Sequence, residues 1–104
     1  IEVPDEIVLN ENFGEFNLSV YVNDYNGDDL TLKLFEDNNL TNYPAEINLT
    51  QADYEQNVTI SLTSKDNIDG NDTLHITVSD GDNNITTSIP IIINKIIYTP
   101  QIAL

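Results

Sequence analysis

Apolar and polar residues alternate with a period of two in short segments of this chain, and this spacing restricts the fold more than any other feature. In residues 69–82, which read DGNDTLHITVSDGD, the side chains of Leu74, Ile76 and Val78 share one side. Such alternation is typical of a strand with one buried face, and the flanking Asp, Asn and Gly residues are typical of turns. The segment therefore predicts a half-buried β-strand between two acidic turns.

About seven segments of this kind follow one another at close spacing, which is the pattern of a β-sandwich. They lie near residues 5–10, 16–22, 30–34, 47–49, 58–62, 69–82 and 85–94. The expected inward side chains include Phe16, Leu18, Val20, Val22, Leu30, Leu32, Leu34, Ile47, Leu49, Val58, Ile60, Leu62, Ile85, Ile89, Ile91 and Ile93. Pro90 cannot donate a ladder hydrogen bond, so the last strand is expected at a sheet edge or with a bulge.

The length of 104 residues suits one domain with a single core. We therefore expect an all-β, seven-stranded, Ig-like (cadherin-like) Greek-key β-sandwich over residues 1–95. Residues 96–104 then form a linker or the start of the next module.

The charge of the chain narrows the classes of partner. Eighteen acidic residues against three basic ones give a net charge of −15. Such a charge repels phosphate backbones and anionic head groups, so nucleic acid and membrane surfaces are not expected partners. The longest apolar run, Ile91-Ile92-Ile93, is far shorter than the roughly 20 residues of a membrane-spanning helix. The absence of cysteine excludes disulfides and thiolate chemistry.

Several motifs occur in a fixed order along the chain. Glu11-Asn12 comes first, FNLSVYVNDYNGDDLTL covers residues 16–32, and residues 70–74 lead into the VSDG motif that ends at Gly81. This order resembles the bacterial cadherin-like tandem repeats, which are Ig-like sandwiches of large surface and secreted proteins. The resemblance covers about residues 1–95, although Asn12 stands where those repeats usually have Asp. It implies a non-catalytic spacer, often calcium-binding, in an extracellular adhesin-type protein.

Two groups of acidic turn residues are candidate Ca²⁺ ligands, because Ca²⁺ takes six to eight oxygen ligands. Sandwich topology places the loop at 24–29 and the turn at 80–84 at one end, with Asp24, Asn26, Asp28, Asp80, Asp82 and Asn84. The opposite end is expected to gather Glu11, Asp37, Asp66, Asp69 and Asp72. An ion shared between consecutive modules would stiffen their joint. The alternative is that these residues only form turns, which Asp and Asn favour without any metal.

Every N-x-[ST] triplet of the chain has Asp or Glu two positions before its asparagine. The six asparagines are Asn17, Asn39, Asn48, Asn57, Asn71 and Asn84. This matches the extended D/E-x-N-x-S/T acceptor pattern associated with bacterial oligosaccharyltransferases, and it predicts N-glycosylation. An exposed strand face made of acid, Asn and Thr produces the same pattern. That alternative explains Asn17, Asn48 and Asn57, expected in strands, better than Asn39, Asn71 and Asn84, expected in loops.

No catalytic constellation is expected. His75 is the single histidine, and strand alternation places it on the outward face beside Thr73 and Thr77, without partners for a triad or a metal site. A sugar-stacking platform would need several exposed tyrosines on one face, and the candidates are Tyr21, Tyr25, Tyr43 and Tyr54. Tyrosines that are dispersed over the surface are ordinary surface residues.

The sequence thus predicts a non-catalytic structural and adhesion module, a spacer repeat of a bacterial cell-surface protein, with Ca²⁺ at its acidic ends. The rival prediction is a carbohydrate-binding module of an adhesin or secreted enzyme. Expected partners are neighbouring modules of the same chain and a cell-surface protein or glycan ligand. The isolated domain is expected to be monomeric.

Overall fold

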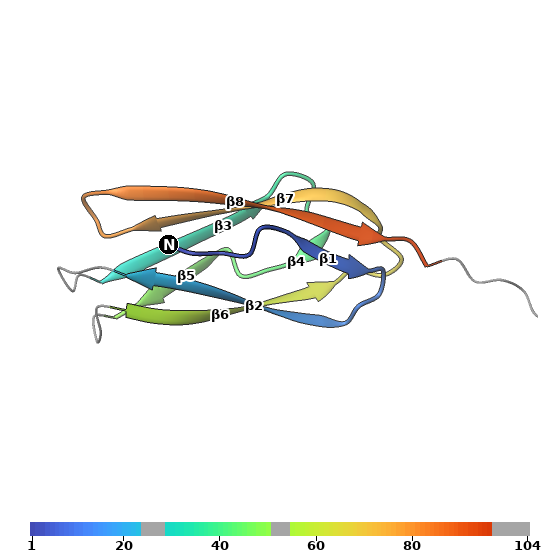
Figure 1. Ribbon diagram of the computed structural model, residues 1–104, viewed down its shortest axis with the longest axis horizontal. Helices are drawn as coiled ribbons and strands as arrows, with labels where there is room; N and C mark the ends of the chain where they lie inside the picture. Colours follow the sequence, from blue (N-terminus) through green and yellow to red (C-terminus); the bar gives the residue numbers. More distant parts are fainter. Residues whose placement is uncertain (24–28, 51–54, 97–104) are drawn as a thin grey trace, which may run out of the picture.

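Eight β-strands form the secondary structure of a computed structural model that describes residues 1–23, 29–50 and 55–96 (Figure 1). The strands are β1 (Ile7–Asn10), β2 (Glu15–Asn23), β3 (Leu30–Glu36), β4 (Thr41–Asn42), β5 (Glu46–Leu49), β6 (Glu55–Ser64), β7 (Gly70–Ser79) and β8 (Asn84–Asn94). A search of these residues for a helix able to cross a membrane finds none. The expected all-β class is confirmed.

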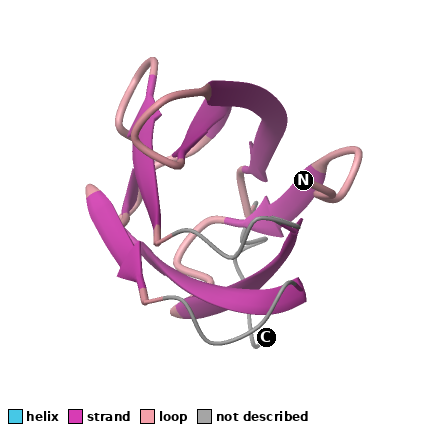
Figure 2. Ribbon diagram, turned by 90° about the vertical axis from the view of Figure 1, so that its left-hand side faces the viewer, coloured by secondary structure: helices cyan, strands magenta, loops and turns pink. Residues whose placement is uncertain are grey.

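The strands form two sheets that face each other across the core (Figure 2). One sheet has five strands in the order β1-β8-β7-β3-β5, and the other has three in the order β2-β6-β4. The segment before β1 forms a bridge from Glu2 to Tyr21 of β2, and β1 then pairs in parallel with β8. The first residues of the chain therefore contact one sheet before the chain joins the other, which closes one side of the sandwich.

The core lies between the sheets and contains the inward side chains that the alternation predicts. Leu18, Leu32, Leu62, Leu74 and Ile91 have no exposed surface. Fifteen buried hydrophobic residues make up this cluster, drawn from β1, β2, β3, β6, β7 and β8. At about 25 cal/mol per Å² of apolar surface removed from water, this two-sheet core is the main source of stability.

Two details differ from the expected arrangement, and a third decides between the two alternatives expected for Pro90. The two-residue strand β4 is an addition, too short to leave an alternating pattern in the sequence. Ile85 is 57% exposed rather than inward, because it lies at the start of β8, beyond the end of the core. The β7 and β8 register is continuous without a bulge, and β1 pairs only with residues 91–94 of β8. Among the described residues, Pro90 therefore lies in the part of β8 that pairs with β7 alone. The edge alternative holds there, and the bulge alternative does not.

The two ends of the sandwich carry different turns. We call the end with the β7–β8 turn, residues 80–83, the hairpin pole. We call the other end the exit pole, because the chain leaves the sandwich there after Asn94; residues 11–14, 37–40 and 65–69 lie at the same end. The N-terminus lies toward the hairpin pole, so the chain starts near one end and leaves at the other (Figure 1).

Candidate functional site

Two buried carboxyl groups meet at the exit pole. Glu36, the last residue of β3, is 4% exposed, and Asp72 of β7 is 6% exposed. The Asp72 carboxylate accepts three backbone amides, from Asn38 at 2.9 Å, Leu40 at 3.0 Å and Thr73 at 2.7 Å. It therefore holds residues 37–40, which connect β3 to β4, in one conformation.

Glu36 satisfies the other end of that connection. Its Oε1 atom accepts the Thr41 amide at 3.0 Å, and its Oε2 atom is hydrogen-bonded to the Thr41 hydroxyl. The Glu36 amide in turn donates to the Tyr43 hydroxyl at 3.0 Å, and that hydroxyl donates to Asn39 Oδ1 at 2.6 Å. Two acids, one threonine and one tyrosine thus form a continuous polar network beneath the loop.

The two carboxyl groups differ in acidity. Burial raises the pKa of Glu36, and its Thr41 hydrogen bonds oppose that effect only in part. Burial also raises the pKa of Asp72, but the amides of Leu40, Asn38 and Thr73 outweigh it, so the pKa of Asp72 is lowered. The charge of Asp72 raises the pKa of Glu36 further. The two carboxyl pKa values are therefore shifted in opposite directions, and Glu36 is the more readily protonated of the pair.

Glu11 ties the end of β1 to the point where the chain leaves the sandwich. Its side chain is 7% exposed, and its Oε1 atom accepts the Ile96 amide at 2.9 Å. The Glu11 amide also donates to the Asn94 carbonyl at 2.8 Å. Two hydrogen bonds from one residue thus fix the direction in which β8 continues beyond Asn94.

The neighbouring turns are joined by a pair of asparagines with left-handed backbones. Asn12 has φ of 58° and Asn67 has φ of 56°, a conformation that Asn tolerates better than most residues. Asn12 Nδ2 donates to Asn67 Oδ1 at 3.1 Å, and the Asn67 amide donates to Asn12 Oδ1 at 2.8 Å. The Asn12 side chain is therefore engaged in holding the exit pole together.

The candidate Ca²⁺ ligands fall into three groups. Asp24, Asn26 and Asp28 lie outside the described residues. At the hairpin pole, Asp80 Oδ1 accepts the amides of Asp82 at 2.9 Å and Asn83 at 2.6 Å, and the Asn83 and Asp82 amides lower the pKa of Asp80. At the exit pole, Glu11 and Asp72 are buried and engaged as described, while Asp66 and Asp69 are exposed. Within the described ranges, no three Asp, Glu, His or Cys side chains are placed to hold one metal ion.

His75 lies on the outward face as expected, but the expectation that it lacks partners is wrong. His75 Nε2 lies 2.9 Å from Asp37 Oδ1, and Nδ1 lies 2.8 Å from Ser88 Oγ. The ring also stacks on Phe35, with centroids 4.5 Å apart. Alternation along one strand could not reveal these partners, because Ser88 faces His75 across the β7 and β8 register and Asp37 follows the end of β3.

The Asp37, His75 and Ser88 side chains have the residue types of a hydrolytic triad. A carboxylate only accepts, so Nε2 carries the hydrogen toward Asp37, while Nδ1 and the Ser88 hydroxyl share the second hydrogen bond. Catalysis would also need donors converging on an oxyanion, whereas amides along a strand point alternately to the two neighbouring strands. On this open sheet face, the trio links β3, β7 and β8.

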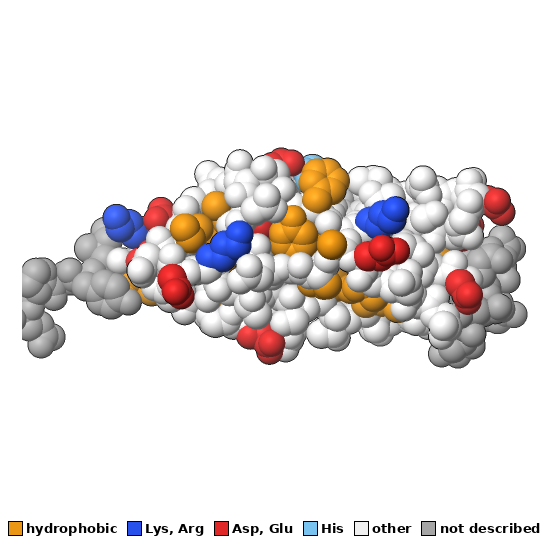
Figure 3. Space-filling model, turned by 180° about the vertical axis from the view of Figure 1, so that it is seen from behind, with side chains coloured by type: hydrophobic (Ala, Val, Ile, Leu, Met, Phe, Trp, Pro, Cys, Tyr) orange, Lys and Arg blue, Asp and Glu red, His pale blue; other side chains and the backbone are white. Residues whose placement is uncertain are grey.

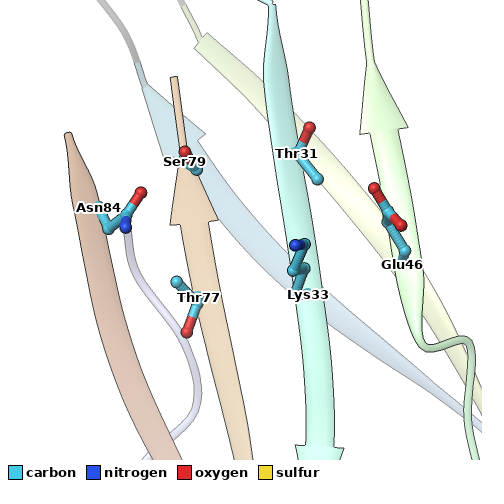
Figure 4. Close-up of a pocket in the computed structure, with 6 residues that line it drawn as sticks. All are labelled: Thr31, Lys33, Glu46, Thr77, Ser79 and Asn84. Atoms are coloured by element: carbon cyan, nitrogen blue, oxygen red, sulfur yellow. The ribbon is translucent and has the colours of Figure 1, made fainter. Parts of the chain in front are cut away.

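A shallow depression of about 270 Å³ lies on the outer face of the five-stranded sheet (Figure 4). Its lining residues are Thr31, Lys33, Glu46, Thr77, Ser79 and Asn84. None of these is aromatic. Tyr43 is half-buried against the core rather than exposed, and Tyr21 is half-buried. Tyr25 and Tyr54 lie outside the described residues. The described residues therefore offer no tyrosine platform for sugar stacking.

Acidic side chains are spread along the molecule on the face that Figure 3 shows, and hydrophobic side chains emerge there as separate small patches. Patches of this kind do not resemble the contiguous apolar surface of a stable protein interface.

All six asparagines of the N-x-[ST] triplets are exposed. Asn17, Asn48 and Asn57 lie in strands as expected, in β2, β5 and β6, and Asn39 lies in the β3–β4 loop. Asn71 and Asn84 were expected in loops but belong to β7 and β8, because both strands begin earlier than the apolar pattern indicates. Their acidic partners Asp69 and Asp82 still lie outside the strands.

The fold and the polar sites together define an Ig-like β-sandwich whose buried acids serve the architecture of its turns. The profile of the family described as Bacterial Ig domain matches residues 1–93, and the chain belongs to this family. Domains of this family occur in bacterial surface proteins and are typically non-catalytic. No curated protein matches the chain.

The chain is similar in fold to solved structures. One of them is the crystal structure of the CsuC–CsuE chaperone–tip adhesion subunit pre-assembly complex from archaic chaperone-usher Csu pili of Acinetobacter baumannii. The match has a TM-score of 0.60 and 11% identity, and it covers 88% of this chain and 54% of that chain. The chain thus spans about half the length of the matched chain of that complex. At this identity the similarity is one of fold.

Proposed function

We propose that the chain is a non-catalytic spacer of an extracellular bacterial surface protein, joined end to end with neighbouring modules of the same polypeptide. One observation carries the proposal: the chain begins toward the hairpin pole and leaves at the exit pole, where Glu11 holds the Ile96 amide. A module of this kind extends a protein by the length of its strands, about 3.3 Å per residue. Family membership and the Ig-like sandwich fold support the same role.

The proposal includes Ca²⁺ at the joint between modules. Its support is the net charge of −15 and the exposed acids Asp66 and Asp69 beside the fixed exit of the chain. Glu11 also contributes, because only one of its two oxygens accepts a recorded hydrogen bond although the side chain is 7% exposed. A second module would bring the acids of its own hairpin pole to this end and complete the ligand shell.

The test is to measure Ca²⁺ binding by calorimetry to two copies of residues 1–104 in one polypeptide, and to the single chain. Binding to the two-module protein that is stronger than to the single chain supports a joint site, and Glu11→Gln should weaken it. Ca²⁺ should also raise the melting temperature above that in chelator by more than Na⁺ at equal ionic strength. Identical melts and no heat of binding contradict the Ca²⁺ part of the proposal.

The spacer role is tested separately by the distance between labels on the two modules. A spacer predicts a long and narrow distance distribution, since Glu11 fixes the exit of the first module. If the distance distribution is broad both in the absence and in the presence of Ca²⁺, the joint is not stiff and the proposal is contradicted. The rival function, carbohydrate binding, has no specific observation in its favour, because the depression of the outer sheet face has no aromatic lining.

A further inference from the structure

Residues 82–86, Asp-Asn-Asn-Ile-Thr, differ from the other five N-x-[ST] segments in exposure. All five of these residues are exposed, including Ile85 at 57%. Each of the other segments contains at least one buried or half-buried residue: Leu18, Thr41, Leu49, Val58 and Asp72 are examples. Residues 82–86 are therefore the one segment of this pattern that the folded sandwich leaves open over its whole length in the described chain.

The hydroxyl two residues after the asparagine distinguishes the sites further. Thr86 is exposed, with its hydroxyl 3.0 Å from that of Thr77. Thr41, which serves Asn39, is 1% exposed and is hydrogen-bonded to buried Glu36. An enzyme that must contact this hydroxyl can reach Thr86 without opening the fold, whereas it cannot reach Thr41.

The backbone around Asn84 is also presented at a free strand edge. β1 pairs only with residues 91–94 of β8, so among the described residues the first part of β8 pairs with β7 alone. An extended backbone with one free edge suits binding by strand addition. The turn before it is held by Asp80, which accepts the amides of Asp82 and Asn83, and this leaves the Asp82 carboxylate exposed.

We propose that Asn84 is the N-glycosylation site of the folded protein, used by a bacterial oligosaccharyltransferase with a polyprenyl-pyrophosphate-linked oligosaccharide as donor. Asn84 Nδ2 forms a bond to the anomeric carbon of the sugar. The polyprenyl pyrophosphate leaves with the electron pair of the broken carbon–oxygen bond, and one carboxamide proton passes to a base. Within the described residues, Asn84 Nδ2 donates no hydrogen bond.

The surface beside Asn84 has room for the attached sugar. Asn84 lines the depression of about 270 Å³, whose hydroxyl groups come from Thr31, Thr77 and Ser79 (Figure 4). These hydroxyls can hydrogen-bond sugar hydroxyls in place of water. A glycan attached at Asn84 would therefore cover the outer face of β3 and β7, which carries the polar hollow.

The experiment compares the purified, folded chain with its tryptic peptides as acceptors for a bacterial oligosaccharyltransferase and a lipid-linked oligosaccharide. Site occupancy is read by glycopeptide mass spectrometry. In the folded chain, Asn84 is expected to be modified roughly a hundredfold faster than Asn17 or Asn57, which require opening of paired strands. In the peptides, the sites should react at similar rates.

Variants separate the parts of the proposal. Asn84→Gln and Thr86→Ala should leave only the slow modification of the other sites of the folded chain. Asp82→Asn should reduce modification at Asn84 at least about tenfold, while the adjacent Asn83→Gln should leave it unchanged. Modification of Asn39 or Asn17 ahead of Asn84, or no modification of the folded chain when peptides react, overturns the exposure argument. An unreactive peptide containing Asn84, or an unmodified intact mass for the protein from its native source, overturns the site itself.

Discussion

Replacing Asp72 with asparagine tests whether this buried carboxylate holds the β3–β4 loop. The carboxylate is 6% exposed and accepts three amides, two at Oδ1 and one at Oδ2. Asparagine keeps the volume and one acceptor oxygen. With its oxygen at the Oδ1 position, its NH₂ group would face the Leu40 amide, so two donors would meet and one buried amide would lose its partner.

The expected cost follows from this loss. A hydrogen bond to a charged group contributes about 1.5–3 kcal/mol, and a buried donor left without a partner costs about 1–3 kcal/mol. Taking these values together, we expect Asp72→Asn to lower the free energy of unfolding by about 2–3 kcal/mol. For a domain of this size that corresponds to a fall in melting temperature of roughly 8–20 °C.

Urea unfolding followed by circular dichroism, with chelator present, measures the effect. The matched control is Asp69→Asn, which removes the same charge from an exposed residue at the same pole and is expected to change the free energy of unfolding by less than about 0.5 kcal/mol. The control matters because removing any acid relieves self-repulsion in a chain of net charge −15. If the two variants unfold at the same urea concentration, the Asp72 hydrogen bonds do not stabilise the fold and the reasoning is refuted.

Two further predictions concern the pole and the core. Because the pKa of Glu36 is raised in the folded chain, protonation of Glu36 favours folding. This contribution is complete below the ordinary pKa of 4.5 and is lost as pH rises through the folded pKa. Glu36→Gln mimics the protonated acid. In urea titrations, the unfolding free energy of this variant minus that of the unmodified chain should therefore increase from pH 4 to pH 7. A difference that stays constant over this range would contradict a raised pKa. Leu62→Ala, at a fully buried position of β6, should cost about 2–5 kcal/mol in the same assay, and a cost below 1 kcal/mol would show that the core collapses around the gap.

The alternation of the sequence is sufficient to predict the sandwich, because one buried face per strand is what a two-sheet core requires. Leu18, Leu62 and Ile91 are inward for this reason. The position where a strand leaves the core is not encoded in its alternation, and Ile85 is exposed although it continues the pattern of Ile89. The partners of His75 also lay beyond reach, since they depend on the register of β8 and on the path of the chain after β3.

The buried acids, by contrast, follow from the same alternation. Glu36 stands two residues after Leu34, and Asp72 stands two residues before Leu74, so both continue an inward series. An acid at an inward position near the end of a strand must find hydrogen-bond donors, and a following loop supplies amides for this purpose. Applied to acids as well as to hydrophobic residues, the period of two would have assigned Asp72 to loop capping before any metal was considered.

This distinction also sorts the acidic turn residues that were ambiguous in the sequence. Asp72 and Asp80 accept backbone amides, as expected of residues that form turns, and such hydrogen bonds lower the pKa of both carboxyl groups. Asp66, Asp69 and Asp82 are exposed and no hydrogen bond to their carboxylates is recorded in the described part of the chain. A cation or an enzyme approaching the folded module therefore meets the second group first. If the acids divide in this way, binding of a cation or an enzyme should depend on Asp82 at the hairpin pole and on Asp69 at the exit pole. The same binding should survive in Asp80→Asn.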